Sequence, residues 1–254
     1  MFSVSAAAPN SHWPYPRFIA HRGGGTLAPE NTLAGFREAR HFCFQGIETD
    51  VMLTADGAAV LSHDPVLGRV VKSASPVASL SLKEIKTLDA GSLTAQKWAG
   101  ERIPTLEEAI ETCEANGLFM NIEIKPASES AALATAQETV RIVRKLFEGK
   151  SLPLLSSFSR NALATAAVEA PEIPRGLLLE GIPTDWKEVC MKLAVKTVHP
   201  DWQSVTPDFV EEAHTMGLGV MCYTVDSPDT ADALFTLGVD AVCTNRLDLF
   251  ADRR

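Results

Sequence analysis

The sequence of 254 residues lacks a long apolar run and lacks any excess of positive charge. No apolar stretch reaches the roughly 18 residues that a membrane-spanning helix needs. Lysine and arginine together number 23 against 32 acidic residues, so the formal net charge is −9. Nucleic-acid-binding proteins and polybasic membrane-surface proteins carry basic patches, so both classes are disfavoured. We expect no nucleic-acid partner and no stable membrane association.

Cysteine is also scarce, with five residues, an odd number, and no CxxC pair. They are Cys43, Cys113, Cys190, Cys222 and Cys243. This usage is typical of reduced, mostly buried thiols in a cytoplasmic protein, and we expect none to be catalytic. The N-terminal stretch MFSVSAAAPNSHWPYPR has no basic start, and its apolar run breaks at Pro9, so it does not read as a secretory signal. We expect a loosely held arm there.

Eight short apolar runs alternate with helical patterns along almost the whole chain. Hydrophobic residues make up 46% of the sequence and charged residues 22%, an ordinary globular composition. Many of the runs are rich in Val, Ile and Leu without polar alternation, as in parallel strands buried on both faces. The predicted strands are Phe18–Ala20, Gly46–Val51, Leu118–Ile124, Leu152–Phe158, Gly176–Leu179, Val195–Val198, Leu218–Val225 and Asp240–Cys243.

Amphipathic helices are predicted between these strands. Thr105 and Glu108 have the spacing of a capping box. Thr206 precedes a proline that suits the first helical position. The predicted helices are Leu33–His41, one after Thr105, one over Ser130–Glu148, and others that begin near Asn161, Asp185, Thr206 and Ser227.

Eight strands with intervening helices predict an α/β protein with a (β/α)8 TIM barrel, and a doubly wound open sheet is the alternative. The length suits one barrel, so we expect residues 1–254 to form a single domain. From residue 64 to residue 102 the chain loses strong periodicity and is too long for a simple loop. It predicts a small inserted subdomain after the second strand, which shapes either the substrate mouth or an interface.

Active sites of such barrels lie at the carboxyl ends of the strands, so polar residues there are candidates. His21 and Arg22 directly follow the first strand, and three glycines that permit close backbone approach come next. The alternative is that His21 only caps the strand and that Arg22 lies on the surface.

Glu48 and Asp50 lie two residues apart on the second strand and therefore share a face. Two carboxylates pointing into a barrel mouth are costly to bury without a cation. A solvated edge strand is the alternative. A short strand in GAAVL, after the turn at residues 55–57, returns His63 and Asp64 to the same region.

Glu123 and Lys125 likewise share one face of the third strand. Three carboxylates from neighbouring strands form an oxygen-rich site that suits Mg²⁺ or Ca²⁺, whereas zinc prefers histidine or cysteine. A local ion pair between Glu123 and Lys125 is the alternative. Mn²⁺ also suits carboxylates, and the sequence favours none of the three ions.

Taken together, these residues resemble the glycerophosphodiester phosphodiesterase family, in particular its compact bacterial cytoplasmic members. The resemblance spans about residues 18 to 250, and one departure is Tyr223, where many members carry tryptophan. The matching elements are HRG and PENT (His21–Gly23 and Pro29–Thr32), Glu48-x-Asp50, His63-Asp64, Glu123-x-Lys125, and more weakly Ser157-Phe158, Tyr223-Thr224-Val225 and GVDAVCTNRLDL.

The resemblance implies a TIM barrel that hydrolyses glycerophosphodiesters to sn-glycerol 3-phosphate and an alcohol. It implies that two histidines act as general acid and base, and we assign His21 as the base and His63 as the acid, although the sequence does not order the two roles. Asp64 is a candidate to orient His63. The implied metal ligands are Glu48, Asp50 and Glu123, and the implied substrate-binding residues are Arg22 and Lys125.

Several further residues are weaker candidates. His199 ends a predicted strand and can reach the rim of the site, while Phe158, Trp202 and Tyr223 can wall the substrate pocket. We expect His12, His41 and His214 to be structural or solvent-facing.

Other functions remain compatible with parts of the pattern. A metal-dependent carbon–carbon lyase would use the carboxylates but gives His21 and His63 no clear role. An amidohydrolase is disfavoured because His-x-His is absent from the first strand. A lysophospholipase D would use the same catalytic set, and a non-enzymatic phosphate-binding barrel is the last alternative. The preferred alcohol headgroup and the oligomeric state stay open.

Overall fold

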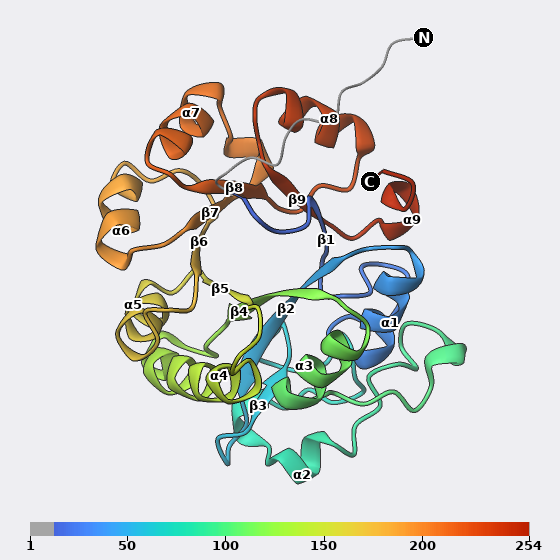
Figure 1. The fold of residues 1–254 in the computed structure, drawn as a ribbon. Helices are drawn as coiled ribbons and strands as arrows, with labels where there is room; N and C mark the ends of the chain where they lie inside the picture. Colours follow the sequence, from blue (N-terminus) through green and yellow to red (C-terminus); the bar gives the residue numbers. More distant parts are fainter. Residues whose placement is uncertain (1–12, 254) are drawn as a thin grey trace.

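Eight parallel strands form a closed barrel with helices around its outside (Figure 1). The computed structural model describes residues 13–253. Strand β1 pairs with both β9 and β2, which closes the sheet, so the open-sheet alternative is wrong and the (β/α)8 barrel is confirmed. The barrel strands are β1 (Phe18–Ala20), β2 (Gly46–Leu53), β4 (Phe119–Ile124), β5 (Leu154–Ser157), β6 (Arg175–Leu179), β7 (Thr197–Pro200), β8 (Gly219–Cys222) and β9 (Ala241–Thr244).

The strand boundaries differ from the predicted ones where apolar sequence continues past the hydrogen-bonded strand. Strand β8 ends at Cys222, yet Val225 beyond it is fully buried in the main core. Similarly, Val195 is buried ahead of the first residue of β7. Because the loops at both ends of the barrel are packed, apolar residues alone do not mark where a strand stops.

The helices follow their predicted caps. Thr105 and Glu108 form a complete capping box, and the Thr206 side chain accepts a hydrogen bond from the backbone N–H of Phe209. The helix predicted over Ser130–Glu148 is shorter and follows a 3₁₀ turn. The helices are α1 (Leu33–His41), α2 (Leu82–Ile85), α3 (Leu106–Ala115), α4 (Ala132–Leu146), α5 (Arg160–Glu169), α6 (Trp186–Leu193), α7 (Pro207–Thr215), α8 (Pro228–Thr236) and α9 (Leu247–Phe250). Within residues 13–253, none has the length and apolarity to cross a bilayer.

A small second core fills the inside of the barrel at the amino ends of the strands. Trp13 packs there beside Ile19 and Leu154, and only 5% of its surface is exposed. Its indole N–H donates to the carbonyl of Pro16 at 3.0 Å. The expectation of a loosely held arm is therefore wrong from Trp13 onward, because this side chain closes the lower end of the barrel. His12 lies outside the described residues.

The predicted insertion is present and has its own apolar core. It follows β3 (Ala59–Leu61), which pairs antiparallel with the end of β2. It carries α2 and two short 3₁₀ turns. Its buried core consists of Met52, Val60, Leu67, Val71, Val77, Ile85, Ala90 and Ile103. Because β3 pairs with the end of β2 at the carboxyl side of the barrel, the insertion stands next to the barrel mouth. A single domain over residues 1–254 stays a prediction.

Candidate active site

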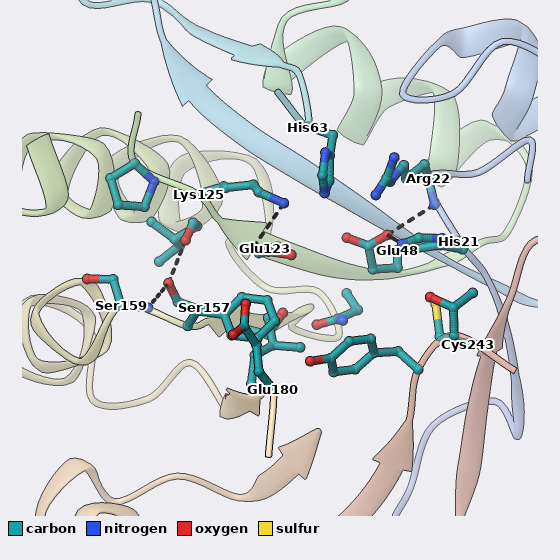
Figure 2. A pocket seen from close by; sticks show the side chains of 18 of the residues that line it. His21, Arg22, Glu48, His63, Glu123, Lys125, Ser157, Ser159, Glu180 and Cys243 are labelled. Carbon is teal, nitrogen blue, oxygen red and sulfur yellow. Dashed lines mark hydrogen bonds and ion pairs between the residues drawn. The ribbon is translucent and has the colours of Figure 1, made fainter. Parts of the chain in front are cut away.

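A cavity of about 770 Å³ opens at the carboxyl ends of the strands (Figure 2). His21 and Arg22 enter it from the turn after β1, and His63 enters it from the segment after β3. Strand β4 supplies Glu123 at its end, and Lys125 follows directly after the strand. The structure therefore brings the residues predicted from separate stretches of sequence into one place.

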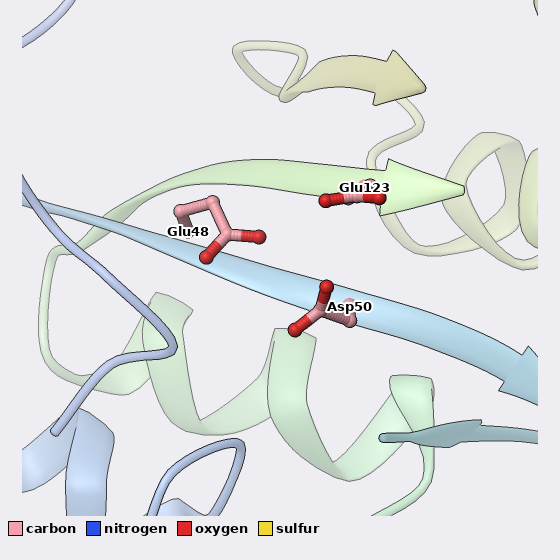
Figure 3. Close-up of side chains that lie close together, drawn as sticks. All are labelled: Glu48, Asp50 and Glu123. Carbon is pink, nitrogen blue, oxygen red and sulfur yellow. The ribbon is translucent and has the colours of Figure 1, made fainter. Parts of the chain in front are cut away.

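The three predicted metal ligands lie close together (Figure 3), and two of them, Glu48 and Glu123, line this cavity. Glu48, Asp50 and Glu123 are buried, and each offers an oxygen within 4.8 Å of the others. Their proximity follows from register, because Asp50 pairs directly with Glu123 across β2 and β4. Oε1 of Glu48 is buried without a hydrogen-bond partner, which is costly unless a cation or a ligand contacts it.

Asp50 is almost fully buried and does not line the cavity itself. Its Oδ2 accepts a hydrogen bond from Nδ2 of Asn31 at 2.8 Å, and its Oδ1 lies 3.1 Å from Nζ of Lys125. Asn31 directly precedes Thr32, and it is the side chain of Thr32 that caps α1. Asn31 instead fixes the orientation of a buried carboxylate.

The charges around the cluster separate the protonation of its members. Burial and the neighbouring Asp50 raise the pKa of Glu123 to about 8, and burial with both neighbouring carboxylates raises the pKa of Glu48. Burial opposes ionisation of Asp50 too, but Lys125 and Arg22 outweigh it and hold its pKa at about 2. Burial and mutual repulsion disfavour the ionised form of both glutamates, and a divalent cation would offset that cost, so the residues present fit such an ion.

The ring of His21 is held by the side-chain amide of Asn245. Nδ1 of His21 lies 2.7 Å from Oδ1 of Asn245, and Nε2 lies 3.8 Å from Oε2 of Glu48. Burial and the nearby Arg22 guanidinium lower the pKa of His21 to about 4. His21 is therefore a neutral imidazole at neutral pH, which is the form that can accept a proton.

His63 is held by a carboxylate in place of an amide. Nδ1 of His63 lies 2.7 Å from Oδ1 of Asp64, as expected from the sequence. Arg69 of the insertion donates from Nε to Oδ2 of the same Asp64 at 2.7 Å. It also donates to Glu30, which in turn contacts Arg22 at 3.1 Å. One chain of ion pairs thus links the insertion to both sides of the cavity.

The two predicted phosphate-binding cations flank the carboxylates. Arg22 has a φ of 50°, a left-handed conformation that costs about 1–2 kcal/mol. This turn directs its backbone N–H to Oε2 of Glu48 at 3.0 Å. Its Nε is buried without a hydrogen-bond partner. Lys125 lies 3.7 Å from Glu123 on the other side.

The aromatic candidates divide into lining and packing residues. Phe158 and Tyr223 line the cavity with their rings perpendicular and their centroids 5.9 Å apart. Tyr223 donates its hydroxyl to the carbonyl of Leu179 at 2.9 Å. Trp202 packs against the main core and is absent from the lining, so its assignment to the pocket wall is wrong.

His199 is not a rim residue. It is fully buried inside the barrel, where Nε2 lies 2.9 Å from the hydroxyl of Thr197 and the ring meets Trp13 edge-on. It packs against Trp13 and does not line the cavity, so the prediction that it reaches the rim is wrong. Cys243 does line the cavity, but burial raises the pKa of its thiol well above its usual value, so it is no nucleophile.

Sequence reasoning missed several polar residues at the site. Asn245 lies in the C-terminal motif GVDAVCTNRLDL, but its role was not predicted, and Arg69 lies in the aperiodic insertion. The side chains of Asn121 and Ser156 line the floor of the cavity, fully buried and without a hydrogen-bond partner. A signal existed for Asn121 alone, since it shares the inward face of β4 with Glu123.

The family model of the glycerophosphoryl diester phosphodiesterases matches residues 21–249. The chain belongs to this family. A glycerophosphodiester phosphodiesterase of Caldanaerobacter subterraneus is 34% identical over 228 residues, which cover 89% of this chain and 93% of the relative. A second, from Bacillus altitudinis, is 30% identical over 93% of this chain and 96% of its own length.

Solved structures of glycerophosphodiester phosphodiesterases share the fold. A phosphodiesterase of Oleispira antarctica, solved in complex with the product sn-glycerol-3-phosphate, has a TM-score of 0.89 and 34% identity, and the match covers 92% of this chain and 95% of that one. A glycerophosphodiester phosphodiesterase of Agrobacterium tumefaciens has a TM-score of 0.78 and 28% identity over 93% and 99% of the two chains. The predictions of family, fold and phosphoric diester hydrolase class are confirmed.

Proposed function

We propose that this protein hydrolyses glycerophosphodiesters to sn-glycerol 3-phosphate and an alcohol, with a divalent cation and two histidines. One observation carries the proposal: three carboxylates within 4.8 Å of one another share a site with two histidines and with the cationic side chains of Arg22 and Lys125. The family membership supports the same reaction.

Glu48, Asp50 and Glu123 would hold the cation, which can be Mg²⁺, Ca²⁺ or Mn²⁺. When bound, it neutralises the phosphodiester oxygens as negative charge grows on them. Arg22 and Lys125 lie on either side of the carboxylates and orient the phosphate group, Arg22 by a planar pair of donors and Lys125 by a point charge.

His21 acts as the base. Its Nε2 takes the proton of the attacking hydroxyl, which belongs either to water or to the neighbouring glycerol hydroxyl in a route through a cyclic phosphate. His63 is the acid and gives its Nε2 proton to the oxygen of the leaving alcohol. The carboxylate of Asp64, 2.7 Å from Nδ1, orients the ring for that transfer.

The decisive experiment follows release of glycerol 3-phosphate from glycerophosphocholine with Mg²⁺, Ca²⁺ or Mn²⁺ added in turn. We expect turnover that a metal stimulates and EDTA abolishes. No turnover with any of the three ions would favour a phosphate-binding protein instead. Assays of lysophospholipids and of oxo-acids, run side by side, separate the lysophospholipase D and lyase alternatives.

The chain is also proposed to act as one domain in the cytoplasm. All five cysteines are free, and four of them are buried, which is the usage of a reducing compartment. We expect the substrate to be a small molecule. The cavity is lined by carboxylates, cationic side chains and aromatic rings, which suit a charged polar ester.

A further inference from the structure

The amide of Asn245 stands in a fixed orientation behind His21. Its Nδ2 donates to Oδ2 of Asp226 at 3.0 Å, so its Oδ1 faces Nδ1 of His21 at 2.7 Å. A carboxylate accepts hydrogen bonds and does not donate them, which excludes the flipped amide. The assignment of oxygen and nitrogen in this amide therefore follows from its neighbour.

Asp226 is itself held by two further donors. Its Oδ1 accepts from the backbone N–H of Asn245 at 2.7 Å and from the hydroxyl of Thr244 at 3.1 Å. With the amide, three donors converge on this carboxylate. Charge-assisted hydrogen bonds of this kind are short and roughly twice as strong as neutral ones. Asp226 is thus an anchor for the whole side chain of Asn245.

The backbone around Asn245 is fastened to the turn that carries His21. The His21 N–H donates to the carbonyl of Thr244, and the Thr26 N–H donates to the carbonyl of Asn245, both at 2.9 Å. Gly25 has a φ of 54°, and a Cβ there would lie 2.2 Å from the Asn245 carbonyl oxygen. The two loops approach so closely that the distance between His21 and Asn245 has little freedom.

We infer that Asn245 and Asp226 are positioning residues that fix a ring proton of His21 on Nδ1, so that Nε2, which faces Glu48 and the cavity, is the nitrogen left to accept a proton. The carbonyl oxygen of Asn245 can only accept, so Nδ1 must donate. A neutral imidazole carries one N–H, so its other nitrogen is a free acceptor. This inference rests on the proposed function, since a base at His21 requires that free nitrogen.

The substitution Asp226→Asn tests the inference without touching His21 or Asn245. The amide introduced at position 226 would keep accepting from the Asn245 N–H through its oxygen and would turn its NH₂ toward the Asn245 side chain. Asn245 must then flip and present its own NH₂ to His21, which moves the ring proton to Nε2. We expect kcat on glycerophosphocholine to fall about 10- to 100-fold, part of the 10²–10⁴ that a general base contributes, with KM changed less than about threefold.

The double variant Asp226→Asn with Asn245→Asp is the rescue. It exchanges amide and carboxylate, so the ring N–H, the side-chain pair and the backbone N–H all keep their partners and the net charge is unchanged. We expect it to recover most of kcat at alkaline pH, because the carboxylate now behind His21 favours the charged ring at lower pH. Asn116→Ala, which removes an amide that bonds Thr112 at the end of α3, serves as a control with unchanged activity.

The direct readout is ¹⁵N NMR of the imidazole nitrogens with Mg²⁺ present, where His21→Gln identifies the signals of His21. Wild type and the double variant should show the proton on Nδ1, and Asp226→Asn should show it on Nε2. An unchanged tautomer in folded Asp226→Asn, or no recovery in a folded double variant, would overturn the inference. If Asp226→Asn does not fold, Asn245→Ala takes its place, with mixed tautomers expected. The NMR result stands whether or not the proposed substrate is hydrolysed.

Discussion

At the scale of single residues, the two histidines differ in what stands behind them. A neutral amide backs His21, whereas the carboxylate of Asp64 backs His63. An amide leaves a neutral ring neutral, while a carboxylate stabilises the charged ring. In the proposed mechanism, burial suits His21 to accept a proton, and the carboxylate behind His63 suits that ring to give one.

The first prediction concerns these two rings. His21→Ala and His63→Ala should each lower kcat by about 10²–10⁴, because each removes a proton-transfer group. Both rings lie at the cavity surface, so the folded state should persist, as checked by circular dichroism. Turnover of glycerophosphocholine is the measurement, and near-normal activity in either variant would reject the two-histidine mechanism.

At the scale of elements, the insertion does more than border the cavity. Arg69 donates to Asp64, in the segment after β3, and to Glu30, in the loop after β1. A segment outside the barrel therefore holds side chains from two loops beside the cavity. The α2 helix and its apolar core hold this segment against the extended end of β2. The insertion is therefore part of what positions His63.

The second prediction is that Arg69→Ala lowers kcat about tenfold, since Asp64 loses a charge-assisted hydrogen bond that steadies it. Arg102→Ala is the matched control, because this arginine of the same insertion donates to the carbonyl of Thr87, away from the cavity. The midpoint of thermal unfolding should move little in both variants, since Arg69 is half exposed. Equal activity in the two variants would contradict the proposed role.

The period of a strand explains which site residues the sequence could predict. Glu48 and Asp50 lie two residues apart on one strand, and Glu123 lies between two isoleucines on another, so the face that each occupies follows from sequence. The position of a residue along the barrel axis does not follow from that period, and so His199 is predicted at the rim although it is fully buried against Trp13. Asn245 acts across loops that only the closed barrel brings together.

At the scale of the whole molecule, the buried charges of the site affect stability. Between its unfolded pKa near 4.3 and its folded value of about 8, the Glu123 carboxyl holds a proton that the unfolded chain releases. Stability therefore falls as pH rises through this range. The lowered pKa of His21 acts in the opposite direction, but only below about 6.5.

The third prediction uses the window from about pH 6.5 to 8, where the glutamate effect stands apart from that of His21. In EDTA, the free energy of unfolding should fall with pH by up to about 1.4 kcal/mol per unit, measured by urea denaturation. Saturating Mg²⁺ should remove the fall by pairing the carboxylates. Glu123→Gln should reduce the slope and leave the contribution of Glu48, whose pKa is also raised by burial, whereas Glu111→Gln, an exposed carboxyl on α3, should retain the full slope. A slope unaffected by Glu123→Gln would assign the effect elsewhere.

The fourth prediction concerns the closure of the barrel. Trp13→Ala should lower the free energy of unfolding by about 3–5 kcal/mol, because it leaves a large void among Ile19, Leu154 and the neighbouring side chains. Val168→Ala, at a residue that is 82% exposed, should change it by no more than about 0.5 kcal/mol. Comparable losses in the two variants would mean that Trp13 is not a core residue.

The packing of Trp13 against the lower core also decides the route that molecules take. Because side chains fill the amino end of the barrel, the cavity communicates with solvent at the opposite end. In the proposed reaction, the substrate would therefore enter, and both products would leave, through the same opening of the cavity. In the proposed reaction the alcohol would leave first, since the phosphate fragment would keep its contacts with Arg22 and Lys125, and the next ester would wait until that fragment departs. Accumulated glycerol phosphate would then slow the enzyme by occupying the passage itself.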